Sequence, residues 1–593
     1  MTVTPLHATP DRASDERTMN RELFGVFGDR AAFERFRDPD AFDRVVGGPA
    51  VTVGVRNAHL DVPGRGSTYT CDRGGAVVFG EVLAPEGVEN AAEWLFERYD
   101  REGRAALAGL NGSYLVVVDV GGEAAVVTDP LRSWECHYLE RDGVRAFGTD
   151  VAPLRSLSET DRMAREPVLE LLHLGTVLGE RTVFEGIRRV PADAALTPSA
   201  VEPLDRFVYA PGEFDYVEAL ADRLTRAIRR REHYTGRTGV LLSGGWDSRV
   251  FLSELPAVDH TYTIGDEDSR EVRVARRVAS QYDADHAALE PGLEYLYPYD
   301  GKLRYSQGIK ETLHIHQAAY EAEFDIDVMY HGLLFDTLFK GYFLEWDGIT
   351  VFGTKLPSNS LVDDPDPIDA LLDTLGFLPD GSRRIPDAVD ELFDDAALDI
   401  DPDLDSSSAF LRERLETELD ACRRLADSTH NLMDCLIIRN QPAMPFRTHL
   451  ADNYLESFVS LDSELLDWHL RTPPEHRNGD TFRRALNRID DEILRHRPPS
   501  RPHTSDYLNQ VERFLRRKLP LVECFQPAWP DRQEIYDRYL LEDELFPEYR
   551  AIHELPARQQ LRVNDLRWWL PDGHERNCDA VRHPGDATGN RTT

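Results

Sequence analysis

The segment that decides the fold is Gly239-Val-Leu-Leu-Ser-Gly-Gly-Trp-Asp-Ser248. Its apolar start predicts a buried strand at 238–242, and a helix is expected from about Asp247. A glycine pair between a buried strand and a helix lets backbone N–H groups approach an anion closely, and the serine hydroxyls add further donors. The segment therefore predicts a phosphate-binding loop. It is neither a Walker loop, which needs G-K-[ST], nor a Rossmann G-x-G-x-x-G turn.

Asp247 lies inside this turn, where a bare phosphate would repel its carboxylate. The position makes sense if Asp247 holds Mg²⁺, which in turn bridges phosphate oxygens. The alternative is a tight turn whose aspartate only caps the following helix. The strand before the turn, the helix after it and the complete S-G-G-x-D-S pattern favour the phosphate interpretation.

The regions on either side of the loop predict the second half of the chain. A helix is expected at 215–232, a second strand at 260–264 and a further helix at 271–282. Strand, turn, helix and strand in that order indicate a parallel sheet with crossover helices, which is an α/β fold. The acidic, proline-rich stretch 356–405 predicts an irregular insertion, and the remainder to about 570 is mainly helical in pattern.

The first part of the chain has a different sequence pattern, which predicts mostly strands. Short strands separated by Gly-Gly and Asp-Gly turns are expected at 24–28, 51–55, 76–79, 114–120, 124–128 and 145–148. One helix, near 88–102, interrupts them, so an α+β domain is predicted. The expected division is a disordered leader at 1–21, a first domain at 22–205, a second at 214–570 and a flexible tail at 571–593.

The hexapeptide at 243–248 resembles the pyrophosphate loop of the N-type ATP pyrophosphatases, and its surroundings resemble the asparagine synthetase family in particular. A second segment, His331-Gly-Leu-Leu-Phe-Asp-Thr-Leu-Phe-Lys-Gly-Tyr342, is similar to that family's S-G-D-G-x-D-E-L-F-G-G-Y. The resemblance implies an adenine nucleotide alpha-hydrolase-like (PP-loop) domain that binds ATP and Mg²⁺, with Asp247 and Asp336 as the magnesium ligands. It assigns catalysis to Ser243, Asp247, Ser248 and Asp336. The nucleotide pocket that it implies comprises Leu242, Ser243, Gly244, Gly245, Asp247, Ser248, Ile264, His331 and Gly332.

In that family the first domain is an Ntn-hydrolase-like class II glutamine amidotransferase whose terminal cysteine attacks glutamine. The family's opening C-G-I-F-G is matched here by Phe24-Gly-Val-Phe-Gly28, and its N-G-E by Phe79-Gly-Glu81. Phenylalanine has no nucleophilic atom, and the asparagine that would stabilise the oxyanion is missing. We therefore expect this domain to be without glutaminase activity.

The second half also departs from the family. Its E-x-R-x-P-F-L-D becomes Gln441-Pro-Ala-Met-Pro-Phe-Arg-Thr448, and the lysine expected some tens of residues later is missing, because no lysine occurs between Lys355 and Lys518. That stretch holds arginines 483, 484, 495, 497 and 501, which could neutralise phosphate charge but cannot deliver a proton as lysine can. Individually each is expected on the surface. The pair His314 and His316 shows no third ligand, which disfavours a metal site.

The resemblance implies that ATP activates a carboxylate as an acyl-adenylate, which ammonia or an amine then converts to an amide. Three alternatives stay open. One is a β-lactam-synthetase-like enzyme or one that amidates a sugar acid or another metabolite. Another is asparagine synthesis with free ammonia or a partner glutaminase. The last is a catalytically silent ATP-binding regulator.

The amino-acid composition limits the kinds of molecule that this protein is expected to bind. The 593 residues carry 106 acidic against 68 basic side chains, only five of them lysine, and a net charge of −38. Such a surface repels nucleic acid and anionic membranes, and dispersed carboxylates with little lysine favour adaptation to high salt. The six cysteines show no C-x-x-C pair, and no apolar run is long enough to span a bilayer. A cytoplasmic protein is expected, acting on a small carboxylate, and a homodimer is an open alternative.

Overall fold

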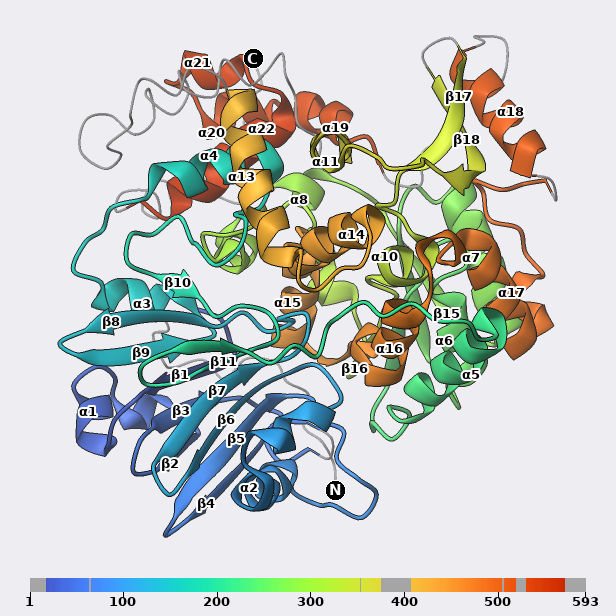
Figure 1. The fold of residues 1–593 in the computed structure, drawn as a ribbon. Helices are drawn as coiled ribbons and strands as arrows, with labels where there is room; N and C mark the ends of the chain where they lie inside the picture. Colours follow the sequence, from blue (N-terminus) through green and yellow to red (C-terminus); the bar gives the residue numbers. More distant parts are fainter. Residues whose placement is uncertain are drawn as a thin grey trace, which may run out of the picture.

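The computed structural model describes residues 18–62, 65–351, 354–374, 407–503, 506–518 and 530–570. Two six-stranded antiparallel sheets form the first part of the molecule, drawn in blue to cyan in Figure 1. One sheet has the order β10-β8-β9-β1-β3-β2 and the other β12-β11-β7-β6-β5-β4. The first comprises β1 (Glu22–Val26), β2 (Arg44–Gly47), β3 (Thr52–Arg56), β8 (His137–Arg141), β9 (Val144–Gly148) and β10 (Arg188–Arg189). The second comprises β4 (Ser67–Cys71), β5 (Gly74–Gly80), β6 (Tyr114–Val120), β7 (Glu123–Thr128), β11 (Ala194–Leu196) and β12 (Val201–Pro203).

The six strands predicted in this part are confirmed as β1, β3, β5, β6, β7 and β9. They are the apolar, buried strands of the two sheets, and the predicted helix is α2 (Ala91–Glu102), capped by Asn90. Most strands that the sequence pattern missed are short, like β10, or half-exposed at a sheet edge, like β4, whereas β8 is a five-residue strand inside its sheet. Three further helices belong here: α1 (Arg30–Glu34), α3 (Val151–Leu157) and α4 (Arg165–Leu174).

A five-stranded parallel sheet organises the second part of the molecule. Its order is β15-β14-β13-β16-β19, with β13 (Thr238–Leu241) at the centre. The other strands are β14 (His260–Ile264), β15 (Asp285–Leu289), β16 (Val328–Tyr330) and β19 (Leu455–Ser457). All four pairings are parallel, which confirms the predicted sheet.

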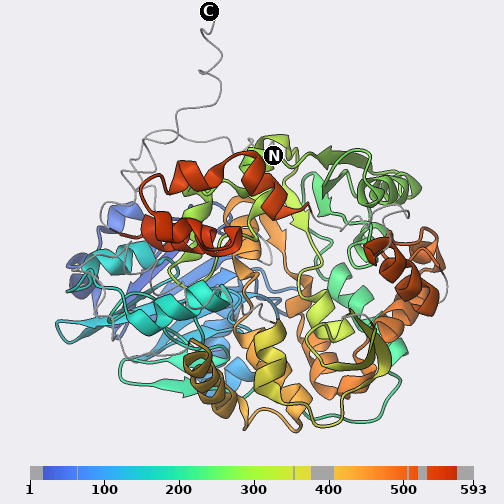
Figure 2. The ribbon, with the colours of Figure 1, turned by 90° about the horizontal axis from the view of Figure 1, so that it is seen from above.

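Helices cover this sheet and extend from it. The predicted helices before and after β13 and β14 are α5 (Tyr216–Arg229), α6 (Arg249–Glu254) and α7 (Arg270–Gln281). Smaller helices are α8 (Leu293–Leu296), α9 (Asp300–Leu303) and α10 (Phe335–Lys340). The helical remainder comprises α13 (Ser407–Cys422), α14 (Thr429–Arg439), α15 (Met444–Asn453), α16 (Ser463–Arg471), α17 (Gly479–Ile489), α18 (Asp506–Lys518), α19 (Arg532–Arg538), α20 (Leu541–Leu545), α21 (Arg550–His553) and α22 (Ala557–Trp568). Seen from above, the blue and cyan sheets lie on one side and most of the green-to-orange segments on the other (Figure 2).

Two predicted irregular segments are partly ordered. The start of the expected insertion at 356–405 is regular, since β17 (Trp346–Val351) pairs antiparallel with β18 (Thr354–Leu361), and α11 (Pro367–Thr374) follows. Residues 375–406 lie outside the described residues. Within the expected leader, Met19 is buried and its N–H donates to Asp150, while the N–H of Arg21 donates to Asp452. The prediction of disorder is therefore wrong for residues 18–21, and residues 1–17 and the predicted tail at 571–593 lie outside the described residues.

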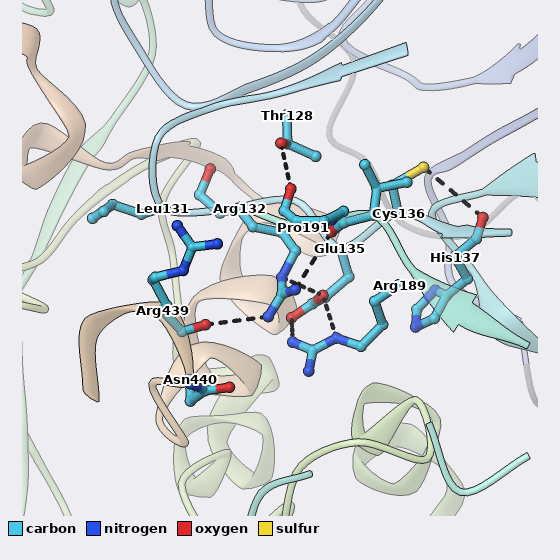
Figure 3. Close-up of polar contacts among 12 residues, drawn as sticks. Thr128, Leu131, Arg132, Glu135, Cys136, His137, Arg189, Pro191, Arg439 and Asn440 are labelled. Atoms are coloured by element: carbon cyan, nitrogen blue, oxygen red, sulfur yellow. Dashed lines mark hydrogen bonds and ion pairs between the residues drawn. The ribbon is translucent and has the colours of Figure 1, made fainter. Parts of the chain in front are cut away.

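Buried ion clusters join the two parts. Figure 3 shows Glu135 between the guanidinium groups of Arg132 and Arg189, at 3.2 and 2.8 Å. Lys310 reaches the same carboxylate at 2.9 Å, and Arg132 donates to the carbonyl oxygen of Arg439. Burial would raise the pKa of Glu135, but the three cations outweigh it and hold that pKa well below its usual range. The interface is therefore fixed by charge as well as by apolar packing. In the part of the chain that the structure describes, no helix is long and apolar enough to cross a membrane.

Candidate functional site

The predicted loop lies at the carboxyl end of the central strand, β13. From β13 the chain proceeds to β14 on one side, and it later returns as β16 on the other side. The carboxyl ends of β13 and β16 therefore diverge at a switch point, which is where open parallel sheets form their ligand crevices. The loop after β13 carries Asp247, and the segment after β16 carries His331 and Asp336. The fold thus brings together two segments that are almost 90 residues apart in the sequence.

A cavity of about 460 Å³ opens at this point. Its volume is within the usual range for small-molecule and cofactor sites. The predicted residues that line it are Leu242, Ser243, Gly245, Asp247, Ser248, Ile264, His331, Gly332 and Asp336. Gly244 instead faces Glu271 and Pro499, and a Cβ atom at Gly244 would lie 2.9 Å from the Pro499 ring. The loop therefore requires glycine at position 244 for packing.

The backbone of the loop is fixed from behind by Arg249. This fully buried side chain donates to the carbonyl oxygens of Gly245 and Gly244 at 2.7 and 2.8 Å. On the other side, the N–H of Gly244 donates to the carboxylate of Glu271 at 2.6 Å, and the N–H of Gly245 to the Ser243 hydroxyl. Burial raises the pKa of Glu271 against the opposing effect of the Gly244 N–H. The N–H groups of this loop can therefore donate hydrogen bonds to an oxyanion, as that of Gly244 does to the carboxylate of Glu271.

The carboxylate of Asp247 does not cap the following helix. Ser248 is the N-cap of α6, and no side chain caps that terminus. Asp247 instead accepts two hydrogen bonds from the Lys340 ammonium, each of 2.8 Å, and Lys340 also contacts Asp336. Burial and the nearby Asp336 raise the pKa of Asp247, while Lys340 lowers it. The capping alternative is therefore wrong, and the carboxylate is engaged in an ion cluster.

The carboxylates of Asp247 and Asp336 are the candidate magnesium ligands at this site. Mg²⁺ demands carboxylate oxygens in near-octahedral geometry, but both oxygens of Asp247 already face an ammonium group. Over the described ranges, no group of three or more His, Cys, Asp or Glu side chains is arranged to hold a metal ion. As the side chains lie, Asp247 and Asp336 do not fit a divalent ion between them, and no chemical step below is routed through one.

His331 is fixed by a buried ionic network. Its Nδ1 accepts from the N–H of Leu333, and its Nε2 lies 2.9 Å from Glu456. Glu456 also binds Arg447 at 3.1 Å, and all three charged or polar side chains are buried. Burial would raise the pKa of Glu456, but Arg447 and His331 outweigh it and hold the pKa at about 2. The network holds the His331 ring against the cavity.

Several residues of the cavity wall escaped the sequence pattern. They are Gln317, Ala443, Pro499, Ser500, Pro502, Asn509, Glu512 and Arg516, together with His314, His316 and Phe446, which the sequence had singled out in other patterns and not at this cavity. Lys340 did have a signal, since it lies four residues after Asp336 on one helix, where the family pattern has glycine. For Arg516, on α18, only the tertiary fold brings the side chain to the site.

The arginines between 483 and 501 divide into two groups. Arg483 and Arg495 pair with Asp480 and Glu492 at the surface, as expected for solvent-exposed side chains. Arg501, in contrast, lies with its guanidinium 5.4 Å from the centroid of the Trp246 ring, directly beside the loop. Arg501 therefore approaches the candidate phosphate site, whereas Arg484 and Arg497 are exposed.

Phe24 and Glu81, the residues that the resemblance aligns with glutaminase motifs, have structural contacts. Phe24 is 1% exposed in β1, where its ring packs on Phe33 and under the guanidinium of Arg37. Glu81 binds Arg231 at 2.8 Å and the hydroxyl of Tyr234 at 2.6 Å. These contacts account for both side chains as core and interface residues.

Two solved structures are similar to this chain at low identity. The glutamine phosphoribosylpyrophosphate amidotransferase of B. subtilis, complexed with ADP and GMP, is 10% identical at a TM-score of 0.18, over 46% of this chain and 60% of that one. A structure described as the allosteric regulatory enzyme of purine biosynthesis is 11% identical at a TM-score of 0.20, over 55% and 70%. The chain thus spans 60% of the first structure's length, and at these TM-scores neither likeness bears on fold or activity.

No curated protein matches the chain. The family model for asparagine synthase matches residues 219–345. This stretch holds β13, the loop with Asp247, β14, β16 and α10, so the match covers both segments that meet at the cavity. Residues 219–345 of this chain are therefore similar to the asparagine synthase family.

Proposed function

We propose that this protein is an ATP-dependent ligase that activates a carboxylate as an acyl-adenylate and converts it to an amide, releasing AMP and pyrophosphate. The observation that carries the proposal is the S-G-G-x-D-S loop at the carboxyl end of β13, facing a cavity of about 460 Å³ within a domain similar to the asparagine synthase family. We assign the domain to the PP-loop type and the first domain to the Ntn-hydrolase type on the same family grounds.

The character of the cavity wall supports an orientation for the nucleotide in this proposal. Leu242 and Ile264 give an apolar surface for the base, and the phosphates lie along the loop. The hydroxyls of Ser243 and Ser248 act as preorganised donors to the pyrophosphate, with Arg501 as the nearby cation. Both serines and Gly245 line the cavity, so no rearrangement of the main chain is needed to reach a ligand.

The chemistry takes two steps. An oxygen of the substrate carboxylate attacks the α-phosphorus of ATP, the bond to the β-phosphate oxygen breaks, and pyrophosphate leaves with that electron pair. A neutral nitrogen then attacks the acyl carbon, the mixed-anhydride bond between that carbon and the phosphate oxygen breaks, AMP leaves with its electron pair, and the nitrogen loses a proton. We propose that the acid binds near His316, Gln317 and Arg516, which also line the cavity.

The nitrogen donor in this proposal is free ammonia, an amine or a partner glutaminase. Phe24 supplies no nucleophile, and its ring is packed in the core of the first domain. The first domain therefore serves as a packing partner for the ligase domain. A direct assay of glutamine hydrolysis tests this proposal. We expect no release of glutamate or ammonia above the background rate.

Isotope exchange between ATP and labelled pyrophosphate tests adenylation. The assay is run in molar KCl across a panel of acids that includes aspartate, with Ser243→Ala, Ser248→Ala and Asp247→Ala beside the natural protein. Loss of one preorganised donor should lower the exchange rate by roughly a hundredfold. Ser253→Ala is the matched control, because the hydroxyl of Ser253 binds Asp490 on the far side of α6.

One observation favours a second candidate function, a nucleotide-binding regulator. The loop N–H of Gly244 and the carboxylate of Asp247 are both engaged within the protein, by Glu271 and Lys340. A regulator would bind ATP tightly and show no exchange with any acid. That result, together with ATP binding that Ser243→Ala weakens, would replace the ligase proposal.

A further inference from the structure

Lys340 occupies the space between two carboxylates that the family resemblance gives to a metal ion. It is the last residue of α10, four residues after Asp336 and therefore on the same helix face. Its ammonium group donates to both oxygens of Asp247 at 2.8 Å and contacts Asp336 as well. Two carboxylates from distant segments of the chain thus contact one ammonium group.

The surroundings hold the lysine in this position. Gly341 follows with φ at +58°, a left-handed conformation that ends α10 directly after the lysine. The last turn of a helix favours a positive side chain. The ammonium also lies 5.7 Å from the centroid of the buried Phe482 ring, which makes a cation–π contact. The side chain is 24% exposed, so its charge is partly shielded from water.

The same charge works against a metal ion. A divalent cation bound to Asp247 would share its oxygens with an ammonium group already in contact with them, and the two cations would repel each other. The lysine also reduces the negative charge that Asp247 and Asp336 present to the phosphates of a nucleotide. Lys340 therefore reduces the repulsion between the two carboxylates and a bound phosphate, which is part of what a bound Mg²⁺ would do.

We propose that Lys340 is the resident cation of the Asp247–Asp336 pair, and that it allows a nucleotide to bind beside these carboxylates without a divalent ion between them. The proposal rests on the proposed function only for the identity of the nucleotide. Lys340 acts as a positioning and charge-neutralising residue, and it forms no covalent bond.

The first test measures a metal alone. Mn²⁺ is titrated into the nucleotide-free, full-length protein and followed by electron paramagnetic resonance, for the natural protein and for Lys340→Met. Removing the ammonium should tighten Mn²⁺ binding at this pair at least about tenfold, because two neighbouring carboxylates lose their internal counterion. Arg423→Met, which opens the exposed Arg423–Asp420 pair, is the control and should change nothing.

The second test measures ATP binding by calorimetry, with Mg²⁺ and with EDTA. The natural protein should bind ATP in EDTA within about threefold of its affinity in Mg²⁺, whereas Lys340→Met should lose at least about tenfold in EDTA. Lys340→Gln, which keeps a hydrogen-bond donor without the charge, should behave like Lys340→Met. It also preserves the test if the methionine variant fails to fold.

Two results would overturn the proposal. One is equal Mn²⁺ affinity in the natural protein and the variants, and the other is ATP binding by the natural protein that EDTA abolishes. The second result would mean that Mg²⁺ displaces the lysine. Failure of acid-dependent exchange, with the Mn²⁺ difference intact, would reject the ligase activity and leave the role of Lys340 standing.

Discussion

Arginine is the counterion of the buried carboxylates around the site. Glu456 faces Arg447, and Asp462 accepts from Arg231 at 3.0 Å, in each case with both side chains buried. A guanidinium group stays charged when buried and presents several donors in one plane, so it can bind a carboxylate and backbone carbonyls together. Arg447, for example, also donates to the carbonyl oxygen of Ser133. Removal of either partner would leave an uncompensated buried charge.

Glu456→Gln should destabilise the protein by about 3 kcal/mol at pH 7, as judged from a pKa lowered from 4.5 to about 2. A lowered carboxyl pKa stabilises the fold above pH 4.5, and this contribution is lost as the pH falls toward 2. Urea unfolding between pH 3 and 7 measures it, and the natural protein should lose more stability on acidification than the variant. The exposed Glu34→Gln, which opens the Arg30–Glu34 pair, serves as control. Equal acid sensitivity in all three proteins would contradict the assignment.

At the scale of elements, α22 closes the molecule against α4 and the segment around Thr312. Arg562 donates to the carbonyl oxygens of Leu172 and His173 at the end of α4, which lies beside α22 in both ribbon views (Figures 1 and 2). Asp565 accepts from the N–H and the hydroxyl of Thr312, at 2.8 and 2.6 Å. The helix is thus held by polar contacts in addition to its buried tryptophans.

Asp565→Asn should remove the pH-dependent loss of folding stability that arises from burying the Asp565 carboxyl between α22 and the segment around Thr312. Burial raises the pKa of Asp565 from 3.8 to about 7. A raised carboxyl pKa gives full stability below pH 3.8, and stability is lost as the pH rises toward 7. The natural protein should therefore lose up to about 4 kcal/mol relative to the variant between pH 4 and 8. Urea unfolding followed by tryptophan fluorescence measures the difference, with the exposed Asp537→Asn as control. A parallel pH profile in both variants would refute the prediction.

At the scale of the whole molecule, charge dominates the surface. The chain carries 106 acidic and 68 basic residues, which gives a net charge of −38. In dilute buffer the excess carboxylates repel one another and destabilise the folded state. Among the described residues, buried acidic and buried basic side chains are nearly equal in number, so the excess of carboxylates lies at the surface. Screening by salt should therefore stabilise the folded protein.

The thermal unfolding midpoint should rise steadily from 0.1 to 2 M KCl. The physical reason is that the screening length falls from about 10 Å at 0.1 M to about 3 Å at 1 M, which weakens repulsion between surface carboxylates. Differential scanning fluorimetry in KCl and in NaCl measures the effect, with sucrose of equal osmolality as the control for excluded volume. A midpoint that is flat, or that rises equally in sucrose, would contradict an electrostatic origin.

Local patterns specified a substantial part of this protein. The apolar run before Ser243 predicted a buried strand, and the glycine pair after it predicted a tight turn, because both are signals carried by neighbouring residues in the sequence. The apolar strands β1, β5, β6 and β14 were predictable for the same reason. The half-exposed strand β4 and the three-residue strand β19 were not, since their pairing depends on partners from elsewhere in the fold.

Sequence by itself determined the loop at 243–248, the parallel sheet around it and the absence of a nucleophile at Phe24. Tertiary structure alone decided that the ammonium of Lys340 lies between Asp247 and Asp336, that Glu271 binds the loop N–H of Gly244, and that α18 contributes to the cavity wall. The physical reason is that hydrogen bonds and ion pairs act over a few ångströms in space. A one-dimensional pattern gives the chemical type of each side chain, but only the folded chain decides which charge neutralises which.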